Sequence, residues 1–181
     1  MLLLILGVLL WVGAHFFKRL MPEQRAALGD KGKGIVAIAI VASIVLMVIG
    51  YRMADGAVFW GRHPATVGIN NLIMIAALYF TSPGPTKGAI FYKMRHPMLF
   101  GFALWAGAHL LVNGDVPSFV LFGGLLVWSL AEMAIINKSE PNWTPPAKGV
   151  IKKDIMFAAI SVLLLVVIGF IHGLIGPAAF G

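Results

Sequence analysis

The chain contains no cysteine in its 181 residues. This absence excludes disulfide bonds, thiolate metal ligands and cysteine nucleophiles, so a metal ion would have to be held by histidine, carboxylate or methionine. Charged residues are also scarce, at 12% of the chain, which is about half the share found in an ordinary soluble domain. Hydrophobic residues make up 60% and occur in blocks of roughly twenty, which indicates a helical membrane protein.

We therefore expect an all-α fold, a polytopic helical bundle in the lipid bilayer, built as a single transmembrane domain over residues 1–181. Polar segments rich in proline and glycine separate the apolar blocks. The apolar N-terminus has no basic region before it and no clear cleavage site, so we interpret it as a retained first span. The six expected spans are about 2–17, 34–51, 65–80, 97–112, 119–136 and 154–175.

The basic residues predict the orientation of these spans. The net charge of +7 is spread over the gaps between apolar blocks, a pattern typical of membrane proteins rather than of proteins that bind nucleic acid. Twelve of the 14 basic residues lie in loops one, three and five, and only Arg52 and Arg62 lie on the other side. Because positive charge stays cytoplasmic, both termini are expected outside.

One short motif occurs twice. Residues 11–15 and 105–109 both read W-x-G-A-H, in the first span of each half of the chain. On a helix the Trp and the His, four residues apart, share one face. The recurrence is compatible with a 3+3 inverted repeat, and coincidence in two apolar helices is the competing explanation.

The five histidines fall into two groups. His63 and His96 each stand between an arginine and a proline at a span end, where anchoring at the membrane interface is the simple interpretation. His15, His109 and His172 lie inside spans or near their ends, so each needs a polar partner. A cofactor site is one explanation, and hydrogen bonds between helices are the other.

Two imidazoles from facing helices can ligate a haem iron axially. Zinc would need three or four protein ligands, and Glu132 is the main carboxylate within the spans. By helix rise, His15 and His109 differ in height by roughly 10–12 Å, which two imidazoles and an iron can bridge. His109 with His172, both toward the outer side, is the alternative pair.

The pattern of these residues resembles the NnrU family of integral membrane proteins. The residues that carry the resemblance are Arg95, His96, Pro97, Gly101, Trp105, His109, Asn113 and Gly114, together with His15, the segment 83–85 and His172. The resemblance implies a multi-pass protein of the bacterial inner (cytoplasmic) membrane, with both termini periplasmic. It also implies a link to denitrification and nitric oxide metabolism.

The family is similar in turn to 15-cis-zeta-carotene isomerase, a haem b enzyme that needs reduced iron. This similarity implies haem b as cofactor, His15 and His109 as iron ligands, and a cofactor pocket that includes Trp11 and Trp105 from the shared motif. It also implies a hydrophobic polyene substrate and a redox partner. The isomerase has a cysteine three residues before its second ligand, where this chain has Ala106, so a thiolate ligand switch is excluded here.

Two other functions remain open at the level of sequence. Arg95-His96-Pro97 before a span also resembles the isoprenylcysteine carboxyl methyltransferases, which use S-adenosylmethionine, although Met98 to Phe100 lack the usual tyrosine. A non-enzymatic haem electron carrier or assembly factor is the other alternative. For Arg95 and His96 we expect a role in binding an anionic group at the cytoplasmic mouth, with anchoring to lipid phosphate as the competing explanation.

Overall fold

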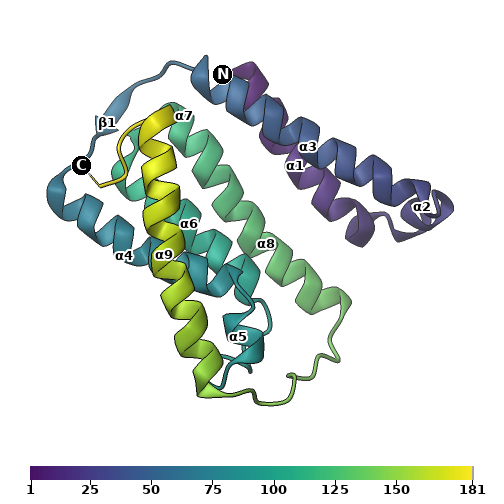
Figure 1. Ribbon diagram of the computed structural model, residues 1–181. Helices are drawn as coiled ribbons and strands as arrows, with labels where there is room; N and C mark the ends of the chain where they lie inside the picture. The colour runs from purple at the N-terminus through teal and green to yellow at the C-terminus, as the bar shows by residue number, and fades with distance from the viewer. Residues whose placement is uncertain (181) are drawn as a thin grey trace.

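The structure is a computed structural model that describes residues 1–180, and each apolar block forms a helix (Figure 1). Five helical segments in this part of the chain are long and apolar enough to cross a membrane, and α6 is a shorter apolar helix. The expected all-α membrane bundle is thereby confirmed. The elements are α1 (Leu2–Leu20), α2 (Pro22–Ala27), α3 (Lys31–Arg52), β1 (Val58–Trp60), α4 (Pro64–Thr81), α5 (Gly84–Lys87), α6 (Pro97–Val112), β2 (Gly114–Asp115), α7 (Val116–Ser118), the π-helix η1 (Phe119–Gly123), α8 (Gly124–Ser139) and α9 (Ile151–Ile175).

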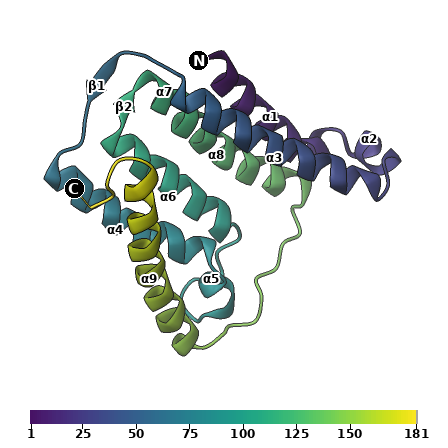
Figure 2. The same cartoon turned by 45° about the horizontal axis from the view of Figure 1, so that its top comes forward.

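The long helices pack in a row in the order α3, α1, α8, α6, α4 and α9 (Figures 1 and 2). The helix α8 thus lies between α1 and α6, the two helices that carry the W-x-G-A-H motif. In a strict 3+3 repeat the first span corresponds to the fourth and the third to the sixth. Because α4 (third) packs against α6 (fourth), α9 (sixth) would then pack against α1 (first). Instead α9 packs on α4 and α5, so the repeat stays a prediction from sequence alone.

Glycine lets the tightest helix pairs approach closely. A Cβ on Gly50 of α3 would lie 2.3 Å from the backbone nitrogen of Leu4 on α1. A Cβ on Gly101 of α6 would lie 2.7 Å from the carbonyl oxygen of Ala77 on α4. In a bilayer, where apolar burial between helices is weak, such close backbone contact is a main source of packing energy.

Two features were not expected from the sequence. First, β1 and β2 pair antiparallel, with Val58 opposite Asp115 and Trp60 opposite Gly114. The ring of Trp60 lies over Gly114 and its indole N–H donates to the carbonyl of Leu110 at 3.0 Å, so β1 covers the end of α6. Second, η1 widens the helical turn just before α8.

The connections gather at two ends of the bundle. Figure 1 shows β1, α7 and the labelled chain ends toward the upper left, α2 at the right, and α5 and the segment 140–150 at the bottom. Termini at one end fit an even number of crossings. The segments at the opposite end are those rich in lysine and arginine.

Candidate functional site

The two histidines of the repeated motif make the same backbone contact. In α1, Nδ1 of His15 lies 2.8 Å from the carbonyl oxygen of Trp11, and in α6, Nδ1 of His109 lies 2.9 Å from that of Trp105. A carbonyl oxygen can only accept, so Nδ1 must carry the proton in both rings. In a neutral imidazole the lone pair then lies on Nε2, the tautomer in which a histidine ligates a metal through Nε2.

Aromatic rings connect the two histidines across α8. The ring of His15 lies 4.7 Å from Trp128, centre to centre, and Trp128 lies 5.2 Å from Phe102. Phe102 is 5.0 Å from Trp105, which in turn is 5.0 Å from His109. We call His15, His109 and the rings of Trp11, Phe102, Trp105, Phe122 and Trp128 the aromatic cluster.

The π-helix shapes the outer end of this cluster. Phe122 lies within η1 and is buried, and its ring stacks on His109 at 4.6 Å with an interplanar angle of 27°. Phe122 also contacts Trp105 edge-on at 5.3 Å. Single π turns inside α-helices occur often at functional sites because they re-aim side chains. Here the wide turn of η1 places the ring of Phe122 against both Trp105 and His109.

Two buried donors of the cluster have no acceptor. The indole N–H groups of Trp11 and Trp128 are shielded from solvent and have no hydrogen-bond partner in the structure. A buried N–H without a partner is unfavourable, by about 1–3 kcal/mol. Both indoles contact His15, at 4.3 and 4.7 Å between ring centres, so the unpaired donors lie beside a candidate ligand.

The motif glycines do not line the histidine face. A Cβ on Gly13 or on Gly107 would have no atom within 4 Å, which places both in open space. Residues two apart on a helix point in different directions, so each glycine faces away from its histidine. The alanines that precede the two histidines differ in burial: Ala108 is buried, whereas Ala14 is only partly buried.

His172 is the third histidine of the spans and comes from α9, outside the cluster. Its Nδ1 donates to the carbonyl of Pro177 at 2.7 Å, which also leaves Nε2 with the lone pair. The alternative pair therefore stays open.

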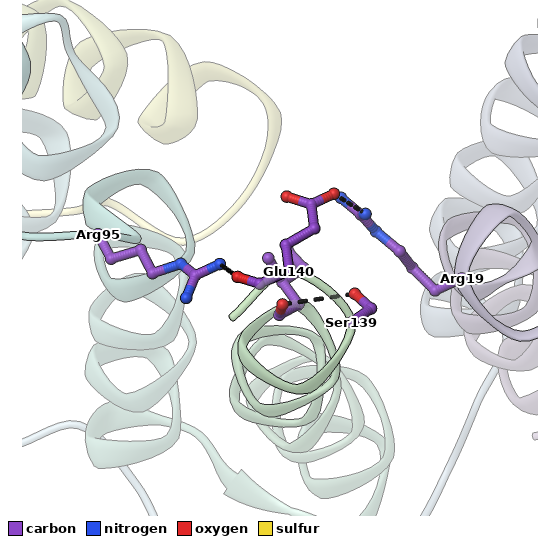
Figure 3. Close-up of polar contacts among 5 residues, drawn as sticks. Arg19, Arg95, Ser139 and Glu140 are labelled. Atoms are coloured by element: carbon purple, nitrogen blue, oxygen red, sulfur yellow. Dashed lines mark hydrogen bonds and ion pairs between the residues drawn. The ribbon is translucent and has the colours of Figure 1, made fainter. Parts of the chain in front are cut away.

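Arg95 and His96 lie at the opposite end of α6, where His96 is the residue that precedes the helix. Figure 3 shows Arg95 beside Glu140, which in turn meets Arg19. Arg95 donates to the main-chain carbonyl of Glu140, and the Glu140 carboxylate pairs with Arg19 from the end of α1. The guanidinium of Arg95 also lies 5.9 Å from the ring of Trp143. Nε2 of His96 donates to the side-chain oxygen of Asn137 at 2.9 Å. These contacts tie the start of α6 to the end of α8.

Two further residues named from the sequence have local roles. His63 caps α4, because its Nδ1 accepts the N–H of Ala65 at 3.3 Å. In return, the backbone N–H of His63 donates to the hydroxyl of Thr66 at 3.2 Å. Glu132 is buried one helical turn after Trp128, and one of its carboxylate oxygens has no hydrogen-bond partner. No group of three or more histidine, aspartate or glutamate side chains within residues 1–180 could hold a metal ion.

Trp128, Phe102 and Phe122 are the members of the cluster that sequence reasoning missed. All three belong to α6 or to the η1–α8 helix, and none is part of a recognisable motif. Trp128 offered a weak signal, since it is the one tryptophan of the fifth apolar block. Its approach to His15 depends on α8 lying between α1 and α6.

A multi-pass helical membrane protein with two histidines in one aromatic cluster is the class that this geometry defines. The chain belongs to the NnrU family: the family model described as NnrU protein matches residues 3–179. No curated protein and no solved structure matches the chain.

The cluster suits a haem in its donor chemistry. Each histidine offers an Nε2 lone pair held in one tautomer, and haem requires no more than two axial ligands from the protein. The unpaired indole donors of Trp11 and Trp128 can serve acceptor groups at the edge of a macrocycle. The aromatic rings fill the space between the histidines, so binding requires Trp128, Phe102 or Trp105 to change rotamer.

Proposed function

We propose that this NnrU protein is an integral membrane haem b protein in which His15 and His109 ligate one iron. The observation that carries the proposal is the identical hydrogen bond of both imidazoles to the carbonyl of the preceding tryptophan, which presents Nε2 in each ring. Such a second hydrogen bond orients a ligating histidine and raises its basicity.

Haem iron supplies one-electron chemistry when bound. The chain's own residues hold and shield it. The carbonyls of Trp11 and Trp105 fix the two tautomers, and the surrounding aromatic rings exclude water. At the basic end, Arg95 uses one guanidinium nitrogen for Glu140 and keeps further N–H donors for an anionic group, either a haem propionate or the head group of a substrate.

The proposal extends to the reaction. We place the family's link to denitrification and nitric oxide metabolism at this iron, with a redox partner that supplies electrons. A redox-gated isomerisation of a hydrophobic polyene is the enzymatic form. An apolar cavity of about 230 Å³ beside Phe102 and Trp105 supports it, because a hydrophobic chain could approach the cluster there. Ala106 stands where the isomerase has its cysteine, and the chain has no cysteine, so a thiolate could not replace a histidine as ligand here.

The first prediction tests the ligand pair. Purified wild-type protein is expected to show a six-coordinate, low-spin spectrum with sharp reduced bands. His15→Ala or His109→Ala opens one axial position, so the iron should become high-spin and bind carbon monoxide, or lose haem. His63→Asn serves as the control, because asparagine keeps the helix cap and His63 lies outside the cluster.

His172→Ala separates the two pairings. A nearly unchanged spectrum is expected for the pair His15 and His109. If His172→Ala makes the iron high-spin while the spectrum of His15→Ala stays like that of the wild type, the ligands are His109 and His172 instead. Protein without haem after expression with ample haem supply would overturn the proposal and favour a methyltransferase that uses S-adenosylmethionine. Turnover of a polyene would distinguish an enzyme from an electron carrier or assembly factor.

A further inference from the structure

Glu132 is the one acidic side chain on α1, α6 and α8, the helices that meet at the aromatic cluster. It follows Trp128 by four residues, so it lies on the face of α8 that brings Trp128 to His15. The residue is only 8% exposed. One of its carboxylate oxygens is shielded from solvent and has no hydrogen-bond partner in the part of the chain that the structure describes. Holding the iron gives this buried acid no role.

The arginine of the neighbouring helix is bound elsewhere. The helix α1 packs against α8, and Arg19 lies one turn after His15, toward the basic end of the bundle. Its guanidinium pairs with Glu140, two turns beyond Glu132 on the same helix (Figure 3). Neither of the two ion pairs within residues 1–180 includes Glu132. An ionised Glu132 would therefore be a buried negative charge without a cation.

The elements packed against α8 offer few other charges. The π-helix η1 has no titratable side chain. The titratable groups on and beside the remaining elements are His15, Lys18 and Arg19 on α1, His109 on α6, Lys138 on α8, and Arg95, His96 and Glu140 just outside the helix ends. The lysines and arginines of this set belong to the last turns of α1 and α8 or precede α6. The interior of the cluster thus contains no permanent positive charge of its own.

Two states of Glu132 are compatible with such an interior. An unpaired carboxylate there is costly, because apolar and aromatic groups replace its water. The cost is avoided by the neutral acid, which carries a proton, or by a carboxylate beside a bound cation. A ferric iron centre with a porphyrin and two neutral imidazoles has one net positive charge, and the ferrous centre has none. The charge of the cofactor therefore selects between the two states of Glu132.

We propose, on the basis of the haem function above, that Glu132 binds the proton that balances each electron at the iron. With ferric iron Glu132 is a carboxylate. When a one-electron donor reduces the iron, Glu132 takes up one proton from water, so the interior gains no net charge, and on reoxidation it releases that proton. The water lies at the basic end, since Glu140, about 12 Å further along α8, has a side chain that is 56% exposed. Glu132 acts on the iron through its charge and is not a ligand.

The second prediction tests this role in the purified, haem-loaded full chain. The equilibrium constant for reduction, from redox titrations with mediators, should fall by up to about tenfold for each unit rise in pH, because reduction takes up one proton. Glu132→Gln has no proton to bind, so its constant should be nearly independent of pH. In alkali the variant should be reduced more readily than the wild type, whose carboxylate stays charged, and in acid the two should agree.

Two control variants and a second measurement separate this role from a structural one. Glu132→Asp keeps an acid and should keep the pH dependence, as should Glu140→Gln, which removes an exposed carboxylate from the end of α8. Infrared spectra of reduced minus oxidised protein should show the C=O stretch of a newly protonated carboxylic acid. This band should shift in heavy water, shift again in Glu132→Asp and be absent from Glu132→Gln.

The possible failures are distinguishable. A pH dependence that is unchanged in Glu132→Gln, or an acid band that persists in this variant, would overturn the role of Glu132 and leave the haem proposal intact. Protein without haem would overturn both, and the visible spectrum alone shows this. If Glu132→Gln does not fold, as thermal unfolding would show, Glu132→Asp decides, since an acid band at the wild-type position in that variant would overturn the assignment.

Discussion

At the scale of single residues, hydrogen bonds decide the chemical state of each polar group. A carbonyl acceptor at Nδ1 places a proton on that nitrogen in His15 and His109, so that in the neutral ring the lone pair lies on Nε2. The pairing of Trp with His on one helix face followed from their spacing of four. The approach of Trp128 to His15 could not be predicted, because it joins residues far apart in the chain.

Glu140 shows the same principle outside the spans. The guanidinium of Arg19, through its hydrogen bond and its charge, lowers the pKa of the Glu140 carboxyl below its usual value. Because the folded protein favours the ionised form, the contact stabilises the fold above the pKa of the unfolded state, about 4.3. The contribution is lost as the pH falls through the lower pKa of the folded state.

The third prediction follows from the lowered pKa of Glu140. At neutral pH, Glu140→Gln should lower the midpoint of thermal unfolding slightly, since the carboxylate is exposed and salt screens the pair. Arg95 should keep its bond, because it uses the main-chain carbonyl. The difference from wild type should vanish in acid and in high salt. Glu23→Gln, without an ion pair in residues 1–180, is the control, and a difference that persists in acid would contradict the assignment.

At the scale of elements, helix pairs are set by small residues and by the ends of the helices. The pair of α4 and α6 depends on Gly101, where the backbones meet. Helix starts were legible in the sequence, since Pro64 and Pro97 open α4 and α6 as their positions indicate. The π turn η1 and the pairing of β1 with β2 were not, because both depend on what lies beside them.

The fourth prediction concerns the contact of α4 with α6. Gly101→Ala places a methyl group 2.7 Å from the carbonyl oxygen of Ala77, so the helices must separate. We expect a loss of stability of about 1–3 kcal/mol. Gly107→Ala, on the same helix with open space around its Cβ, should cost nothing comparable. Thermal or denaturant unfolding in detergent measures the stability of both variants. If Gly101→Ala were as stable as Gly107→Ala, the close approach of α4 and α6 at Gly101 would be contradicted.

At the scale of the whole molecule, charge and packing order carry different information. Twelve of the 14 basic residues lie in loops one, three and five, toward the end of the bundle opposite the termini (Figure 1). This asymmetry predicts which end faces the cytoplasm. The order α3, α1, α8, α6, α4, α9 brings both motif helices to α8 and leaves α9 at one edge of the row.

The fifth prediction tests the orientation. The chain has no cysteine, so a single introduced thiol is the only site for a maleimide. Gly61→Cys, in the connection before α4, is exposed with no atom near its Cβ and should react with an impermeant reagent added to intact cells. Ala147→Cys, exposed in the loop before α9, should react only after permeabilisation. The reverse pattern would invert the topology.

The sequence by itself determined the membrane class, the helical segments, the charge asymmetry and the pairing of Trp with His in each motif. These properties depend on composition and on spacing within one helix, so they need no knowledge of neighbours. Only the tertiary structure decided that Trp128 and Phe102 link the two motifs and that Asp154 of α9 accepts hydrogen bonds from Tyr79 and Ala89. Such contacts join separate helices, and in a bilayer almost any apolar face can serve as a contact surface. Close approach at glycines and a few buried polar groups then choose the neighbours.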